Sequence, residues 1–377
     1  MTDSVGVVET SVVDLVPPAD PLVLAGGDEL RHVEVAYETY GTLNADASNA
    51  VFLCHALTGD AHAAGIHADT GRVGWWDNLI GPGKPLDTDR WFVVCPNILG
   101  GCQGTTGPSS VDPDTGELWG LRFPLLAMGD FVAVHRLLGR HLGVTRWAAV
   151  IGGSLGGMQV LDWTLSHPDE VANAIVIAAS SRLTAQNIAF SAVGRQSIMR
   201  DPGFAGGDFL ARGTNPDTGL AVARMMAHIT YLSETAFSEK FGRTPQNGRS
   251  VGGFGVDFAV ESYLDHQGEA FLSRFDALSY LYLTRVMDYF DPFASPDALD
   301  RVRQERPRTL VVSFDTDWRF STEHSRRIVR HLESARVPVS FREITSVWGH
   351  DSFLLAIPDY HATIRAFLDR AADELGV

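Results

Sequence analysis

The sequence predicts an α/β fold with a mostly parallel sheet and helices on both of its faces. Short, nearly continuous apolar runs occupy residues 50–54, 91–95 and 147–151, as expected of parallel strands that are buried on both faces. Stretches with apolar residues at helical spacing alternate with such runs. A glycine-rich turn at residues 152–157 joins the third run to a helical stretch, which completes a strand–turn–helix pattern.

The remaining elements of this predicted sheet follow in chain order. Residues 31–40 alternate apolar and polar side chains, which predicts an antiparallel strand near the edge of the sheet. Residues 129–142 and 158–165 predict helices, the second one closed by His167 and Pro168. Residues 171–179 predict the next strand. The sequence therefore reads strand, helix, strand, helix, strand up to about residue 182.

An inserted helical segment is predicted from residue 183 to 295. This region shows no short buried strand pattern, and it carries helical spacing at 220–232 and 269–290. Glycine-rich loops at 203–207 and 252–255 separate its helices. The sheet pattern then resumes with a strand at 309–314, a helix at 321–335, a strand at 339–344 and a final helix ending near Glu374. We therefore expect a core at 1–182 and 296–377, with a helical lid at 183–295.

Composition limits the classes of partner. The chain has 377 residues, 45% of them hydrophobic, and a formal net charge of −16, so it can bury a large core but repels phosphate backbones and anionic lipid. The three cysteines give no disulfide framework, and residues 1–16 lack the pattern of a secretory signal. We expect a cytoplasmic protein with no nucleic-acid or membrane partner. An anionic cofactor such as CoA would need a local basic patch.

Ser154 is the candidate nucleophile. It lies in Gly152-Gly153-Ser154-Leu155-Gly156-Gly157, a G-x-S-x-G motif preceded by an apolar strand and followed by a helix. A turn this tight needs glycines, and it presents the serine hydroxyl at the positive N-terminal end of the helix. This context favours the α/β-hydrolase fold and covalent acyl transfer over an incidental serine in a glycine-rich turn.

A serine hydroxyl needs a base, and the base needs an orienting acid. In this fold the order along the chain is serine, acid, histidine. Asp317 follows the strand at 309–314 by a few residues and is the expected acid, with Asp315 as the alternative or as a brace for the turn. His350 is the expected base because it is the only histidine between the last strand and the final helix.

Two backbone amides are the expected oxyanion donors. One is the N–H of Leu155, the residue after the nucleophile, and the other is the N–H of Leu57 in the loop after residue 54. The nearby His55, His62 and His67 match no familiar metal spacing. The sequence also has no phosphate-binding G-x-x-x-x-G-K-[ST] loop and no dinucleotide fingerprint, so we expect no metal and no permanently bound cofactor.

Several longer motifs carry a specific resemblance that spans about residues 20–370. The chain resembles the homoserine O-acetyltransferases, acyltransferases of the α/β-hydrolase type on the methionine route. The matching segments are 54–62 (CHALTGDAH), 74–76 (GWW), 96–102 (PNILGGC), 104–108 (GTTGP), 152–159 (GGSLGGMQ), 194–196 (GRQ), 223–225 (ARM) and 228–231 (HITY). A departure occurs at 318–321, where Trp-Arg-Phe-Ser replaces the more usual Leu-Phe-Pro-like residues.

The resemblance implies a ping-pong reaction. Acetyl-CoA would acylate Ser154, CoA would leave, and the hydroxyl of L-homoserine would attack the acetyl-enzyme. It implies the triad Ser154, Asp317 and His350, a helical lid that keeps water scarce, and a homodimer. Homoserine is a zwitterion, so Arg224 is expected to bind its carboxylate and Asp351 its ammonium group, with further contacts from Tyr231 and Thr58.

Three alternatives remain open from the sequence. The same triad can use succinyl-CoA as donor or L-serine as acceptor, but a succinyl group requires an extra cation near Ser154. The motif loops contain no unassigned arginine or lysine, which favours an acetyl donor. A plain esterase would use the same three side chains with water as acceptor. A noncatalytic binding protein is disfavoured by an intact triad in the expected order.

Overall fold

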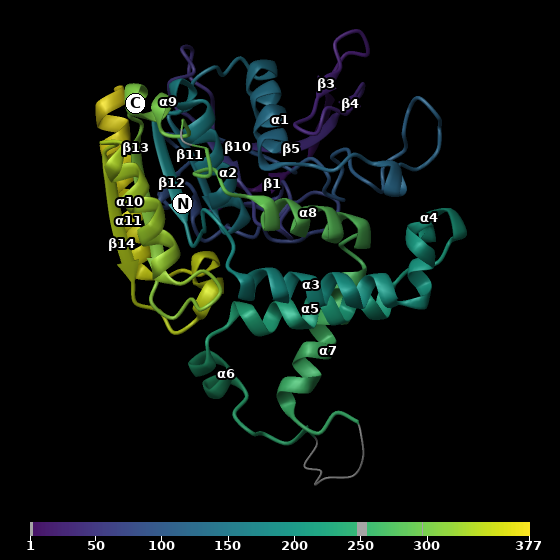
Figure 1. Ribbon diagram of the computed structural model, residues 1–377. Coiled ribbons are helices and arrows are strands. Elements are labelled where there is room, and N and C mark those ends of the chain that lie inside the picture. The colour runs from purple at the N-terminus through teal and green to yellow at the C-terminus, as the bar shows by residue number, and fades with distance from the viewer. Residues whose placement is uncertain (1–2, 247–254, 296) are drawn as a thin grey trace.

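An eight-stranded sheet forms the centre of the molecule in the computed structural model, which describes residues 3–246, 255–295 and 297–377 (Figure 1). The strand order is β14-β13-β12-β11-β6-β10-β5-β2. The six strands from β14 to β10 run parallel, whereas β5 pairs antiparallel with both β10 and β2. The predicted mostly parallel sheet with an antiparallel strand toward one edge is therefore confirmed.

The sheet strands, in spatial order, are β14 (Val339–Ile344), β13 (Arg308–Phe314), β12 (Asn173–Ile177), β11 (Ala149–Gly153), β6 (Ala50–Cys54), β10 (Phe92–Pro96), β5 (Glu34–Tyr40) and β2 (Ser11–Asp14). Three short pairs lie outside the sheet: β1 (Val7–Val8) with β7 (Ile66–His67), β3 (Leu22–Val23) with β4 (Glu29–Leu30), and β8 (Ile80–Gly81) with β9 (Leu86–Asp87).

Both faces of the sheet are buried, as the apolar runs predict. Within β6, Phe52 and Cys54 belong to one apolar cluster, together with residues of α1 (Met128–His141) and α2 (Leu155–Ser166). The alternate residues Val51 and Leu53 belong to a second cluster, with residues of α11 (Pro358–Leu375). Successive side chains of a strand point to opposite faces, so each buried strand connects the two halves of the core.

Two short helices complete the core, α9 (Asp300–Glu305) and α10 (Thr322–Ser334). Short 3₁₀ segments of three or six residues occur at Gly120–Arg122, Pro168–Glu170, Pro202–Gly207 and Gly349–Leu354. Within the described residues, no helix combines the length and the apolar character that crossing a lipid bilayer requires.

In the described residues of the segment 183–295, the regular elements are all helices. The segment contains α3 (Ala185–Arg200), α4 (Phe209–Arg212), α5 (Asp217–Tyr231), α6 (Glu234–Lys240), α7 (Ala259–Leu272) and α8 (Ala277–Tyr289). Helices α3 and α5 pack side by side, and α8 lies between α3 and the sheet core (Figure 1). Of the glycine-rich loop at 252–255, residues 252–254 lie outside the described residues.

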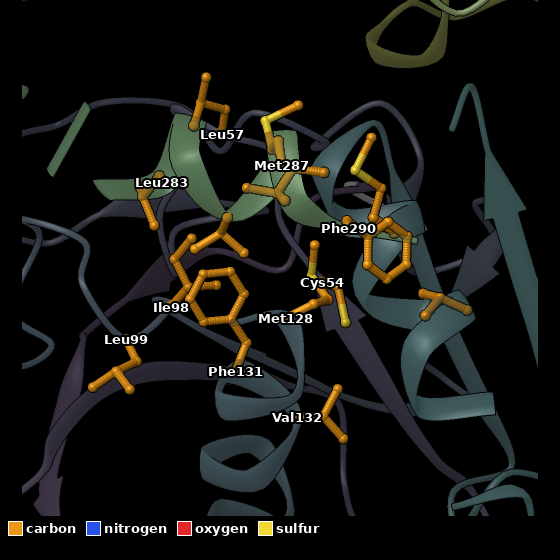
Figure 2. Close-up of a cluster of buried hydrophobic side chains, with 14 of the residues drawn as sticks. Cys54, Leu57, Ile98, Leu99, Met128, Phe131, Val132, Leu283, Met287 and Phe290 are labelled. Carbon is orange, nitrogen blue, oxygen red and sulfur yellow. The ribbon is translucent and has the colours of Figure 1, made fainter. Parts of the chain in front are cut away.

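The expected helical run at 269–290 is wrong as a single helix. The chain breaks after Leu272 and restarts at Ala277, because the Asp276 side chain accepts a hydrogen bond from the amide of Ser279 and begins α8. The amide of Asp276 is also held, at 3.3 Å from Sγ of Cys102. This break turns α8 back along the core and places its apolar face over the loop that follows β6 (Figure 2).

Candidate active site

Ser154 lies at a sharp turn between β11 and α2, with φ 58° and ψ −123°. This left-handed conformation is strained for a residue with a side chain, and such strain concentrates at functional sites. The turn is possible because Gly156 has no side chain: a Cβ there would lie 2.0 Å from the carbonyl oxygen of Cys54. The start of α2 therefore packs directly on the end of β6, with the serine at the helix N-terminus.

The structure brings Ser154, His350 and Asp317 into one hydrogen-bonded chain. Nε2 of His350 lies 2.9 Å from Oγ of Ser154, and Nδ1 lies 2.7 Å from Oδ2 of Asp317. All three residues are buried, with 7%, 2% and 2% of their surface exposed. Because Nδ1 faces a carboxylate it carries the ring proton, which leaves Nε2 free to accept the proton of the serine hydroxyl.

The acid is held by its second oxygen. Oδ1 of Asp317 accepts a hydrogen bond of 2.8 Å from the amide of Phe320, which fixes the orientation of the carboxylate toward His350. Asp315 lies outside this chain: it is exposed, and its Oδ1 accepts the amide of Ser346 at 2.9 Å. The geometry thus matches the expected pairing of Asp317 with His350 and gives Asp315 the bracing contact.

Aromatic rings surround the imidazole of His350. The ring centroids of Phe320, Phe353 and Tyr231 lie 5.1, 5.6 and 6.1 Å from that of His350. Phe320 follows the acid, Phe353 follows the base, and Tyr231 is the last residue of the inserted helix α5. The insertion therefore contributes one of the aromatic rings that pack around the base.

The two expected oxyanion donors come from the start of α2 and from the loop after β6. Leu155 is the first residue of α2, so its N–H has no partner within the helix. Leu57 lies in the loop that follows β6, and its side chain is buried in the apolar cluster that includes Leu283 and Met287 of α8 (Figure 2). Within the described residues, neither amide donates a backbone hydrogen bond. Both are available to a substrate oxygen.

The side chains expected at a homoserine site come from the loop after β6 and the inserted helix α5. Nη1 of Arg224 lies 3.3 Å from Oγ1 of Thr58, and its guanidinium lies 5.7 Å from the ring centroid of Tyr231 and 4.6 Å from that of Phe271. Its Nε is buried without a hydrogen-bond partner. In the described part of the chain, no carboxylate lies within 4.0 Å of this guanidinium.

Asp351 directly follows His350 and is the anionic member of the same set. Burial raises the pKa of this carboxyl group, while the nearby His350, Arg224 and Lys240 oppose that rise. Among the described residues, its side chain makes no hydrogen bond or ion pair, so its oxygens are available to a ligand. Arg224 and Asp351 therefore provide a cation and an anion near the serine–histidine pair.

Sequence reasoning missed Arg319, which lies two residues after the acid. It is only 6% exposed, and its Nη1 donates a 2.7 Å hydrogen bond to Oγ1 of Thr230. Its guanidinium lies 5.6 Å from the ring centroid of Tyr231 and 5.5 Å from that of Phe320, two of the rings that pack on His350. In the described part of the chain no acidic side chain comes within 4.0 Å of it. A buried cation without an anion is costly unless a ligand neutralises it.

The histidines that follow β6 each have protein partners. Nδ1 of His62 lies 2.9 Å from the carboxylate of Glu38, and Nε2 lies 2.8 Å from the carbonyl oxygen of Arg72. His67 accepts the amide of Asp69 at 3.2 Å. No group of three or more potential metal ligands occurs among the described residues.

The cysteines are poor nucleophiles. Burial raises the pKa of Cys54 and of Cys95 well above the ordinary thiol value and raises that of Cys102 to about 11. All three therefore remain thiols at neutral pH. The serine is the group that the site activates.

Comparison with known proteins supports the same fold. Residues 49–356 match the family model described as alpha/beta hydrolase fold. A homoserine O-succinyltransferase of Nocardioides sp. is 55% identical over 98% of this chain and 100% of its own length. A homoserine O-acetyltransferase of Rhodospirillum rubrum is 55% identical over 95% of this chain and 92% of its own length.

Two groups of solved structures share the fold. The homoserine O-acetyltransferase of Bacillus anthracis superposes with a TM-score of 0.86 at 25% identity, covering 96% of this chain and 98% of its own. Esterase E22 superposes with the same TM-score at 28% identity, covering 96% of this chain and 100% of its own. The predicted α/β-hydrolase fold is confirmed, and the chain belongs to the alpha/beta hydrolase family and, within it, to the homoserine O-acyltransferases.

Proposed function

We propose that this protein transfers an acyl group from an acyl-CoA to the hydroxyl of L-homoserine, through an ester on Ser154. We infer homoserine as the acceptor substrate from the placement of Arg224 and Asp351 beside the serine–histidine pair. Each side chain lacks a charged partner of its own within 4.0 Å in the described residues, and together they complement an amino acid's carboxylate and ammonium group. The names of the relatives, homoserine O-succinyltransferase and homoserine O-acetyltransferase, support the same acceptor.

The first half-reaction follows from the hydrogen-bonded chain. As Oγ of Ser154 attacks the thioester carbonyl, its proton passes to Nε2 of His350, and Asp317 stabilises the resulting imidazolium. The negative charge on the carbonyl oxygen is stabilised by the amides of Leu57 and Leu155. When the C–S bond breaks, His350 returns the proton to the CoA sulfur, which leaves as a thiol.

The second half-reaction repeats these steps with homoserine. Nε2 of His350 takes the proton of the substrate hydroxyl, whose oxygen attacks the acyl-enzyme carbonyl. The tetrahedral intermediate collapses with cleavage of the bond to Ser154, and the proton returns to Oγ of the serine. Binding of homoserine between Arg224 and Asp351 gives its hydroxyl a high effective concentration relative to water.

We further propose succinyl-CoA as the preferred donor, in place of the acetyl-CoA expected from the sequence. That expectation depended on the lack of an unassigned arginine or lysine in the motif loops, and buried Arg319 lies against Tyr231 and Phe320, two of the rings that pack on His350. A succinyl group carries a distal carboxylate that would neutralise it through a charge-assisted hydrogen bond. Relatives named homoserine O-succinyltransferase, 50% to 55% identical, support this choice. An acetyl donor is the alternative, supported by the relative from R. rubrum.

The remaining expectations stay proposals. The product would serve methionine biosynthesis in the cytoplasm, as the family resemblance implies. We propose a homodimer formed through the insertion, because α3 and α5 expose the apolar side chains of Ile188, Val193, Val222 and Ile229. A single monomer mass in light scattering at micromolar concentration would exclude such a dimer.

The decisive measurement is thiol release from succinyl-CoA and from acetyl-CoA, each with L-homoserine, with L-serine and with no acceptor. We expect fast release that needs homoserine, is larger with succinyl-CoA, and disappears in Ser154→Ala. Preference for acetyl-CoA would overturn the donor proposal and keep the mechanism. Release that does not depend on an acceptor would favour an esterase, the function of the solved neighbour E22, and would overturn the transferase.

A further inference from the structure

The two amides expected to stabilise the oxyanion belong to segments far apart in the sequence. Leu155 begins a rigid helix, whereas Leu57 lies in the irregular loop between β6 and the short strand β7. An oxyanion donor is effective only when it is held in place before the reaction. The contacts that fix the loop relative to the helix therefore determine the geometry of the site.

His55 is the first residue of this loop and is 1% exposed. Its Nε2 lies 3.0 Å from the amide nitrogen of Ile98, and its Nδ1 lies 2.7 Å from the carbonyl oxygen of Ala56. An amide can only donate, so Nε2 is the unprotonated nitrogen and Nδ1 carries the proton and donates to Ala56. Burial lowers the pKa of His55, which keeps the ring neutral in this tautomer.

The carbonyl that His55 binds belongs to the peptide unit of the expected donor. The C=O of Ala56 and the N–H of Leu57 lie in one plane and point in opposite directions, because a trans peptide is planar. Holding the carbonyl oxygen therefore fixes the direction of the Leu57 N–H. The side chain of Leu57 is fixed independently, in the cluster with Leu283 and Met287 of α8 (Figure 2).

Gln159 connects the loop to the helix that carries the other donor. Its Nε2 donates to the carbonyl oxygen of His55 at 3.1 Å and lies 3.4 Å from that of Leu155. Its Oε1 lies 2.8 Å from Nε2 of His135 in α1, and both side chains are almost fully buried. One side-chain amide thus spans the backbone of both segments.

We propose that His55 is a positioning residue for acyl transfer: its Nδ1–H orients the peptide unit of Leu57, and Gln159, bound to the carbonyl oxygen of His55, ties the preceding peptide unit to the helix of Leu155. The inference depends on the proposed acyl-enzyme chemistry of Ser154, but not on the identity of the donor or the acceptor. His55 touches no reacting atom. Its contribution is to keep both oxyanion donors aimed at one point.

Two substitutions of His55 separate this role from simple packing. In His55→Asn the side-chain amide nitrogen can replace Nδ1 and donate to Ala56, while the contact with Ile98 is lost. In His55→Gln the side-chain oxygen can replace Nε2 and accept from Ile98, while the contact with Ala56 is lost. Each variant loses one buried hydrogen bond, so their melting temperatures should fall by similar amounts.

The measurement is the burst of p-nitrophenolate when each enzyme is acylated by p-nitrophenyl acetate. We expect the acylation rate constant to fall about 100-fold in His55→Gln and no more than about 10-fold in His55→Asn. KM should change little, because an oxyanion donor that points in the wrong direction stabilises the transition state less but does not alter binding of the ground state. Asn49→Ala is the matched control: it removes three partly buried hydrogen bonds of 2.9 to 3.0 Å at the other end of β6 and should leave the rate unchanged.

Equal rates in the two His55 variants, or a loss that follows melting temperature across all three proteins, would overturn the inference. If His55→Gln does not fold, Gln159→Met tests the same connection, and an unchanged acylation rate there counts against it. If the wild type shows a burst but its rate of thiol release does not depend on homoserine, the proposed function is refuted, whereas the inferred role of His55 is unaffected. No burst in the wild type would refute both.

Discussion

Asp317 and His350 form the shorter of the two hydrogen bonds in the triad, 2.7 Å between Oδ2 and Nδ1, and the other oxygen of the same carboxylate accepts the amide of Phe320. The carboxylate therefore has one orientation, and that orientation decides which imidazole nitrogen carries the proton. A neutral amide at this position could donate to Nδ1 and select the wrong tautomer.

The substitution Asp317→Asn should lower kcat by about 10,000-fold with little change in the fold, because Nε2 would then carry the proton and could not accept that of Ser154. Asp315→Asn is the control, since its side-chain oxygen can still accept the amide of Ser346. We expect this control to keep kcat near the wild-type value. Steady-state thiol release measures both, and equal losses would contradict the assignment of the acid.

Arg319 should decide the preference between acyl donors. In Arg319→Leu we expect kcat/KM for succinyl-CoA to fall about 100-fold, because a charge-assisted hydrogen bond to the distal carboxylate is lost. The value for acetyl-CoA should stay close to wild type. The neighbouring Thr230 hydroxyl keeps its 2.7 Å hydrogen bond to the carbonyl oxygen of Ala227, so the substitution leaves no new unpaired hydroxyl.

The ratio of the two donors is the informative quantity for Arg319. A similar fall with both donors would mean that the arginine supports the lid or Tyr231 and has no role in donor choice. Arg319→Lys provides a second comparison, since it keeps the charge but loses the planar fork of the guanidinium. We expect its succinyl-CoA activity to lie between those of the wild type and Arg319→Leu.

Asp351 should act on the acceptor alone. In Asp351→Asn we expect KM for homoserine to rise about 100-fold, as for loss of a hydrogen-bonded charge pair, while the acylation burst remains.

The pH dependence of KM for homoserine has a definite sign. Because burial raises the pKa of Asp351, its carboxylate takes up a proton at a higher pH than an ordinary aspartate, so KM for homoserine should rise as pH falls toward that pKa. In the variant, KM should be high and insensitive to pH in that range.

Sequence patterns were sufficient for the residues whose position depends on the order of strands. Ser154, Asp317 and His350 each follow a strand of a parallel sheet, and the carboxyl ends of such strands meet at one edge, so spacing alone predicts that they lie together. The geometry agrees for all three. Leu57 and Leu155 follow strands in the same way, although their action as oxyanion donors stays a prediction.

Sequence patterns failed for residues whose surroundings are formed by segments that are distant in the sequence. Arg319 reads as an ordinary loop arginine, and only the fold places it against Thr230 and Tyr231 of α5. His55 reads as one of three clustered histidines, and only the fold brings its Nε2 to the amide of Ile98, 43 residues away. The break between α7 and α8 was missed because both helices share the same apolar spacing, and the cap at Asp276 interrupts it locally.

Asp162 predicts how the stability of the protein depends on pH. Burial, aided by the nearby charge of Asp130, raises the pKa of Asp162 to about 7. The unfolded chain releases this proton near pH 4 and the folded protein near pH 7, so between these values the folded state binds more protons. The free energy of unfolding should therefore decrease as pH rises from 4 to 7, by a few kcal/mol at most from this group.

Urea unfolding at a series of pH values measures this decrease in the free energy of unfolding. Asp162→Asn, which cannot titrate, should remove this decrease and be more stable than wild type at pH 8, whereas a parallel pH dependence in the two proteins would show that Asp162 is ionised in the folded state.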